Sequence, residues 1–143
     1  GNCKDAAEKQ MNNAGIYQSG PQNAIQMEVD KNRNPSLAPN PIGAMIYIMT
    51  QLKEGKPVMI GVMNVDEQNR KDVGNVNSNT SHFMVITRML KSYGGGTPAF
   101  GYYDNASRQY GNHMNNLLVT DPEKEVLKGS KYQGTEVRKN VEE

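Results

Sequence analysis

The sequence lacks tryptophan, holds a single cysteine and contains no long hydrophobic run. One cysteine excludes an internal disulfide framework, so cysteine usage leaves the redox compartment open. No apolar run approaches the ~20 residues that a membrane-spanning helix needs. We therefore expect no transmembrane segment, and no secretory signal peptide is visible either.

Neither sign of charge dominates, because 16 basic and 15 acidic residues leave a net charge of +1. No basic stripe with interleaved aromatic residues occurs, and such a stripe is the usual footprint of nucleic-acid binding. Two histidines and one cysteine are too few for a typical structural zinc site, and His113 lies in a loop-like Gly-Asn-His-Met stretch. We expect no nucleic-acid partner, no metal and no cofactor.

The chain has 143 residues, which is the usual length of one domain with its own core. Its mean hydropathy of -0.75 is low, but the apolar residues cluster in segments, which argues against disorder. We interpret residues 1–143 as a single domain. Because the first residue is Gly rather than Met, we expect the chain to be a processed or recombinant piece of a longer protein.

Two segments have helical patterns. In residues 3–13, one Cys, two Ala, one Gln and one Met share a helix face at i, i+3, i+4, i+7 and i+8, with Asn2 as the N-cap and Gly15 at the end. A second helix is predicted between Asn40, which fits the N-cap before a first-turn proline, and Gly55. The Asn-, Gln- and Pro-rich stretch between the helices is predicted as a long loop, with a short helix near residues 22–29.

Strands dominate the second half of the chain. Three glycines near residues 94–96 separate two apolar runs, which predicts an antiparallel hairpin, and a polar loop is predicted over residues 66–80. The predicted strands cover residues 57–65, 82–90, 100–103, 117–120 and 134–138. Helices followed by a strand meander indicate the α+β class.

Three residue types suggest a catalytic site. Cys3 comes early, His82 opens an apolar run, and Asp104 closes another with Asn105 behind it. A helix N-terminus and a nearby imidazolium both favour a thiolate, which is the nucleophilic form of cysteine. A carboxylate or amide then orients the imidazole. The predicted hairpin would bring residues near 82 and 104 to the same end of two paired strands.

Each of these residues also has an ordinary structural interpretation. A single cysteine is often a small buried apolar residue, and Cys3 shares its predicted helix face with Ala6 and Ala7. His82 could simply begin a strand, and Asp104 with Asn105 could form a turn. The combination of chain order, helix position and hairpin placement favours the catalytic interpretation.

Three motifs resemble the papain-like cysteine peptidases of bacteria, most closely the type that processes bacteriocin leaders. Besides the cysteine segment, residues 52–62 are LKEGKPVMIGV, residues 82–87 are HFMVIT, and residues 102–104 are YYD. The resemblance covers roughly residues 2–107. It implies a papain-like α+β fold, in which a Cys-bearing helix packs on an antiparallel sheet of about five strands.

The resemblance also implies roles for the site residues. Cys3 would be the nucleophile, His82 the general base and acid, and Asp104 the orienting residue, with Asn105 as the alternative third member. Such enzymes usually carry a Gln a few residues before the cysteine as an oxyanion donor, but only Gly and Asn precede Cys3 here. Either that Gln was removed with a preceding segment, or the Cys3 backbone N–H and another donor form the oxyanion hole.

The C-terminal segment, from residue 116 to residue 138, resembles the ends of secreted bacterial toxin modules. This likeness implies a secreted or periplasmic antibacterial effector that cuts a peptide or a peptidoglycan stem peptide, with a cognate inhibitor or immunity protein as partner. Two alternatives stay open. One is a non-catalytic papain-like module that binds a peptide, and the other is a membrane-tethered lipoprotein domain lipidated at Cys3.

Overall fold

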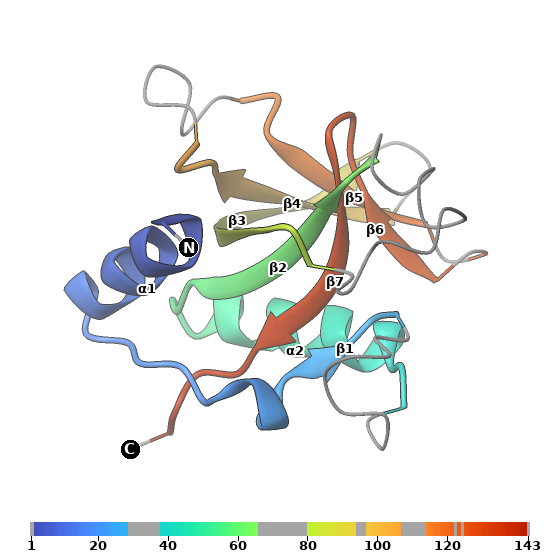
Figure 1. Cartoon of the computed structure of the whole chain (residues 1–143). Coiled ribbons are helices and arrows are strands. Elements are labelled where there is room, and N and C mark those ends of the chain that lie inside the picture. Colours follow the sequence, from blue (N-terminus) through green and yellow to red (C-terminus); the bar gives the residue numbers. More distant parts are fainter. Residues whose placement is uncertain are drawn as a thin grey trace.

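The strands of this chain form a closed barrel, as its computed structural model shows (Figure 1). The structure describes residues 2–28, 38–65, 80–93, 97–106, 114–121, 123 and 125–142. Within these ranges the chain forms helices α1 (Asn2–Asn13) and α2 (Pro41–Lys53) and the 3-10 turn η1 (Pro21–Asn23). The strands are β1 (Ile25–Gln26), β2 (Val58–Asn64), β3 (His82–Tyr93), β4 (Thr97–Tyr103), β5 (Leu117–Asp121), β6 (Val126–Lys128) and β7 (Tyr132–Arg138).

All strand pairs are antiparallel, and the strand order is β1-β7-β2-β3-β4-β5-β6. A further pairing of β6 with β7, through Lys128 and Gln133, closes six strands into a barrel and leaves β1 as an added strand on β7. The predicted papain-like α+β fold with an open sheet of about five strands is therefore wrong. Closure removes the free sheet edges that such an open sheet would keep.

Alternation along the strands separates two apolar clusters. The larger fills the barrel and includes Ile60, Met84, Phe100, Leu118 and Leu127. On the other face of β2 and β3, the smaller cluster lies under α1 and joins Ala7 and Met11 to Met59, Phe83 and Val85. Because both faces of β2 are covered, its residues from Val58 to Met63 are all buried. The continuous apolar run of this strand follows from that double burial.

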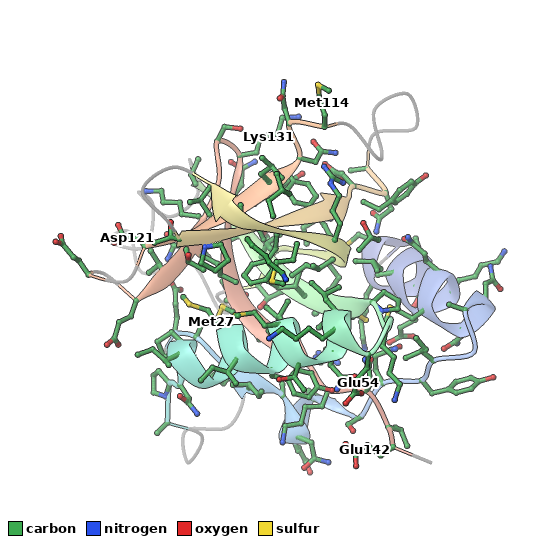
Figure 2. All side chains as sticks on the ribbon, turned by 180° about the vertical axis from the view of Figure 1, so that it is seen from behind. Met27, Glu54, Met114, Asp121, Lys131 and Glu142 are labelled. Carbon is green, nitrogen blue, oxygen red and sulfur yellow. The ribbon has the colours of Figure 1, made fainter. Side chains whose placement is uncertain are left out.

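Helix α2 packs against the end of the barrel at which β2 begins and β7 ends. Its buried residues Ala44 and Ile48 belong to the same cluster as Val58 and Val137. Figure 2 shows α2 from behind, with Met27 between the helix and the barrel. The predicted cap is confirmed, because the side-chain oxygen of Asn40 accepts a hydrogen bond from Gly43 N–H at 3.0 Å.

Both predicted helices end as expected. Gly15 and Gly55 have φ values of 78° and 77°, a left-handed conformation that glycine adopts without strain. Helix α1 spans Asn2–Asn13, so Asn2, the predicted N-cap, is its first residue. Neither described helix is both long and apolar enough to cross a membrane.

Other local predictions need correction. Residues 21–26 form the turn η1 and the strand β1 instead of the short helix expected near residues 22–29. The short strand β6 was not predicted, although it closes the barrel. The hairpin of β3 and β4 is confirmed by the pairing of Val85 with Tyr103. Its glycine turn at residues 94–96, most of the loop at 66–80 and His113 lie outside the described residues.

Candidate active site

Three strand termini meet at the end of the barrel opposite α2. His82 is the first residue of β3, Asp104 directly follows the last residue of β4, and Tyr132 opens β7. Strand β2 lies between β3 and β7, since Val62 pairs with His82 and Asn64 pairs with Tyr132. The barrel therefore brings an imidazole, a carboxylate and a phenol from distant parts of the chain to one place.

His82 and Asp104 form a direct hydrogen bond. The His82 Nε2 and Asp104 Oδ1 atoms are 3.0 Å apart, and the two side chains are only 11% and 5% exposed. The Ala106 backbone N–H donates to the same oxygen at 2.9 Å. Because an ionised carboxylate only accepts hydrogen bonds, Nε2 is the donor of this pair and Nδ1 is the nitrogen left to accept a proton. The predicted hairpin does bring these two residues together.

Tyr132 is a third buried member of this cluster that the sequence did not suggest. Its hydroxyl donates to Asp104 Oδ2 at 3.1 Å, and its ring stacks on His82 with centroids 5.4 Å apart at 28°. Both carboxylate oxygens of Asp104 are thus engaged, one with His82 and one with Tyr132. No local motif marks Tyr132, because its place in the site depends on the long-range pairing of β7 with β2.

The two neighbouring tyrosines hold their protons strongly. Burial, followed by the charge of Asp104, raises the pKa of Tyr102 to about 12. Burial and then Asp104 also raise the pKa of Tyr132, and the last contribution to that shift is the charge of Cys3. The rings of Tyr102 and Tyr132 meet edge to face, 6.0 Å apart. Tyr132 therefore acts as a hydrogen-bond donor to Asp104 at neutral pH.

These raised values predict a loss of stability in alkali. A tyrosine in the unfolded chain ionises near pH 10, whereas folded Tyr102 keeps its proton to about pH 12. Between these values the unfolded state binds fewer protons, so the free energy of unfolding falls as the pH rises and is unaffected below this window. We expect Tyr102→Phe to make the fall shallower, with Tyr132 causing the remainder. Urea unfolding at about pH 9 and about pH 11 measures the free energy of unfolding of the wild type and of Tyr102→Phe. An equal fall between the two pH values in both proteins would contradict the role given to Tyr102.

Asn105 has a different place from the one considered in the sequence. Its side-chain amide donates to the Phe83 carbonyl at 3.0 Å and to the Cys3 carbonyl at 3.2 Å. The residue that bonds the His82 ring is Asp104. Asn105 instead ties the first turn of α1 to the start of β3, one residue after His82. This bridge brings the backbone carrying Cys3 beside the backbone carrying His82.

Cys3 is the second residue of α1, and its side chain is free and half-buried. Ala7 and Met11, one and two turns later, are fully buried against Met59, Phe83 and Val85. Residues four apart share a helix face, so Cys3 lies on the face of α1 that turns toward the barrel.

The arrangement offers proton transfer and a nucleophile. An imidazole bonded to a carboxylate can take a proton from a thiol and return it to a leaving group. Among the residues that the structure describes, no three His, Cys, Asp or Glu side chains are grouped so that they could hold a metal ion.

Comparison with known protein families, with curated proteins and with solved structures gave no match for this chain.

Proposed function

We propose that this protein is a cysteine hydrolase that cleaves an amide bond through a thioester intermediate. Cys3 is the nucleophile, His82 the general base and acid, and Asp104 the residue that orients the imidazole. The observation that carries the proposal is the buried 3.0 Å hydrogen bond between His82 and Asp104, beside the first turn of the Cys3 helix.

The hydrogen bond between His82 and Asp104 supports a specific part for His82 in the reaction. Nε2–H is held by Asp104, so Nδ1 takes the proton of the Cys3 thiol. The sulfur attacks the carbonyl carbon, and the amide C–N bond breaks as His82 returns the proton to the leaving amine. Water, activated by the same Nδ1, then cleaves the thioester and releases the acid. Asp104 stabilises the imidazolium in both halves of the cycle.

The position of Cys3 in α1 supports a site for the developing oxyanion. The first N–H groups of a helix have no partner inside the helix, and Cys3 is the second residue of α1. Its backbone N–H can therefore donate to the oxyanion formed at the carbon that its own sulfur attacks. One such donor is supplied without any residue upstream of the helix.

For the substrate we propose a peptide amide, and more specifically the stem peptide of peptidoglycan. That choice rests on the resemblance of the sequence motifs to bacterial cysteine peptidases and toxin modules. An antibacterial effector of this kind would act outside the producing cell and would have a dedicated inhibitor. Digestion of two substrates distinguishes the possible activities. A cell-wall amidase would cleave purified muropeptides, whereas a general peptidase would cleave a casein-type protein.

Thiol labelling tests the proposal directly. We expect iodoacetamide to alkylate Cys3 near neutral pH faster than it alkylates free cysteine, and His82→Ala to slow this reaction by roughly tenfold or more. Digestion of muropeptides and casein by the wild type, with Cys3→Ser as control, identifies the substrate. A labelling rate equal to that of free cysteine and unchanged in His82→Ala would eliminate the enzyme and favour a binding module.

A further inference from the structure

An ion pair is buried on the outer face of the barrel, next to the start of β3. The Arg138 Nε donates to Glu136 Oε2 at 2.9 Å, and the side chains are 4% and 0% exposed. Both residues lie on β7, two positions apart, and therefore point to the same face. Met59 and Gly61 of β2 pair with them and share this face. Charged side chains are rarely buried so completely unless they are paired.

The carboxylate of this pair holds the residue two positions before His82. Glu136 Oε1 accepts a hydrogen bond from the Thr80 hydroxyl at 2.8 Å. The Thr80 and Thr135 hydroxyl oxygens are 2.7 Å apart. Since the single Thr80 hydroxyl proton goes to Glu136, Thr135 donates to Thr80. Glu136 and Thr135 together fix the side chain of Thr80.

The guanidinium of the pair holds the residue that follows His82. Arg138 Cζ lies 5.0 Å from the centroid of the Phe83 ring, in the geometry of a cation–π contact. The Phe83 carbonyl accepts from Asn105, whose amide also bonds the Cys3 carbonyl. Arg138 therefore contacts the residue that connects β3 to the helix of the nucleophile.

Glycine at position 61 makes room for these contacts. Gly61 pairs with Phe83 on one side and with Glu136 on the other. A Cβ atom at this position would lie 2.7 Å from Glu136 Cγ, 2.8 Å from Thr80 Cγ2 and 3.1 Å from Phe83 Cε1. The first two distances are shorter than carbon atoms adopt and the third is tight, so a side chain at position 61 would require these groups to move. The space left by the missing side chain of Gly61 is therefore shared by the ion pair, Thr80 and Phe83.

Stability alone gives little reason for this pair. The cost of removing two charges from water often exceeds their attraction, and apolar residues of similar size frequently replace buried pairs without loss. A buried network does, however, fix a single local geometry when all its members are bonded. Here the fixed residues are those at positions 80 and 83, which flank His82.

We infer that Glu136 and Arg138 are positioning residues for His82, acting through Thr80 on one side of it and Phe83 on the other. This inference rests on the proposed function, in which His82 must keep Nε2 on Asp104 and turn Nδ1 toward Cys3. The ion pair holds the backbone of residues 80–83 in the one arrangement that permits both contacts. Loss of either anchor allows the imidazole to leave that orientation while the barrel stays folded.

Thr80→Val tests the inference with the smallest change. Valine has nearly the same shape as threonine but lacks the hydroxyl that bonds Glu136. We expect Thr80→Val to slow the alkylation of Cys3 roughly tenfold, the size expected when one member of a shared network is lost. Thr80→Ser, which keeps the hydroxyl, is expected to restore the rate. Thr120→Val is the matched control, because Thr120 also donates a buried hydrogen bond, to the Pro98 carbonyl at 2.8 Å.

A spectroscopic readout separates positioning from general destabilisation. The ring N–H of His82 that bonds Asp104 gives a downfield resonance in protein labelled with ¹⁵N-histidine, and His113→Gln identifies the signal of the other histidine. We expect this His82 resonance to weaken in Thr80→Val and to persist in Thr120→Val. Thr80→Val with the wild-type alkylation rate and the wild-type resonance would overturn the inference.

A second variant keeps the test decisive if Thr80→Val does not fold. Phe83→Leu keeps an apolar side chain under α1 but removes the ring beneath Arg138, and we expect the same slowing and the same weakened resonance. Unchanged values would again overturn the inference. Failure of the proposed function is distinct, because alkylation would then be insensitive to His82→Ala in the otherwise unchanged protein.

Discussion

Asp104→Ala is expected to lower the rate of amide hydrolysis by about 10³–10⁴-fold, the usual effect of losing the residue that orients a catalytic imidazole. Asp104 accepts from three donors: His82 Nε2, the Ala106 N–H and the Tyr132 hydroxyl. Without the carboxylate, the imidazole loses the partner that sets its tautomer. The same change leaves the largely buried His82 and Tyr132 donors without their acceptor, each costing ~1–3 kcal/mol where water does not replace it.

Asp104→Asn separates the charge from the orientation. In this variant the Oδ1 atom can still accept from His82 and Ala106, while the new amide group faces the Tyr132 hydroxyl, which can turn to accept. The imidazole therefore keeps its orientation and loses only the negative charge beside it. We expect a loss of about tenfold, the difference between a charged and a neutral hydrogen bond. Single-turnover hydrolysis of the identified substrate, with melting temperatures as the control for folding, measures both variants. Equal losses in Asn and Ala would show that an amide cannot replace the carboxylate in holding the imidazole and its tautomer, and would contradict the expectation for Asp104→Asn.

The sequence predicted this contact for a simple physical reason. A strand, a glycine-rich turn and a second strand form an antiparallel hairpin, and the ends of such a hairpin lie side by side. His82 and Asp104 are at those ends, so local patterns were enough to bring them together. The cap at Asn40 and the glycines after both helices follow from equally local rules.

The barrel and its buried charges could not be found in this way. Closure depends on one pairing between β6 and β7, and β6 has only three residues. Alternation along β7 resembles a strand with one solvent face, yet all seven of its residues are buried. From the sequence alone, the charged residues Glu136 and Arg138 would therefore be predicted to lie on the solvent-exposed face of the strand. Tyr132 is hidden for a related reason, since only the long-range pairing of β7 with β2 brings the start of β7 beside His82.

Arg138→Met is expected to lower the free energy of unfolding by ~3–5 kcal/mol, because it leaves the Glu136 carboxylate buried without its cation. Methionine fills much of the space beside Phe83, so the loss reflects the unpaired charge more than a cavity. Urea unfolding at neutral pH gives the value. Lys4, which has a 3.8 Å ion pair with Glu8 at 42% and 40% exposure, is the matched control: Lys4→Met should cost no more than ~1 kcal/mol. A similar cost at both positions would mean that the buried pair is no more demanding than a surface one.

The double variant Glu136→Leu with Arg138→Met extends this prediction to function. Removing both charges eliminates the unpaired carboxylate, so we expect most of the lost free energy of unfolding to return. The alkylation of Cys3 should nevertheless stay slow, because Thr80 has lost its acceptor and Phe83 has lost its cation. Recovery of stability without recovery of reactivity would separate the two roles of the pair. If both recovered together, the ion pair would be a structural element only, and the orientation of His82 would depend on Asp104 and Tyr132 alone.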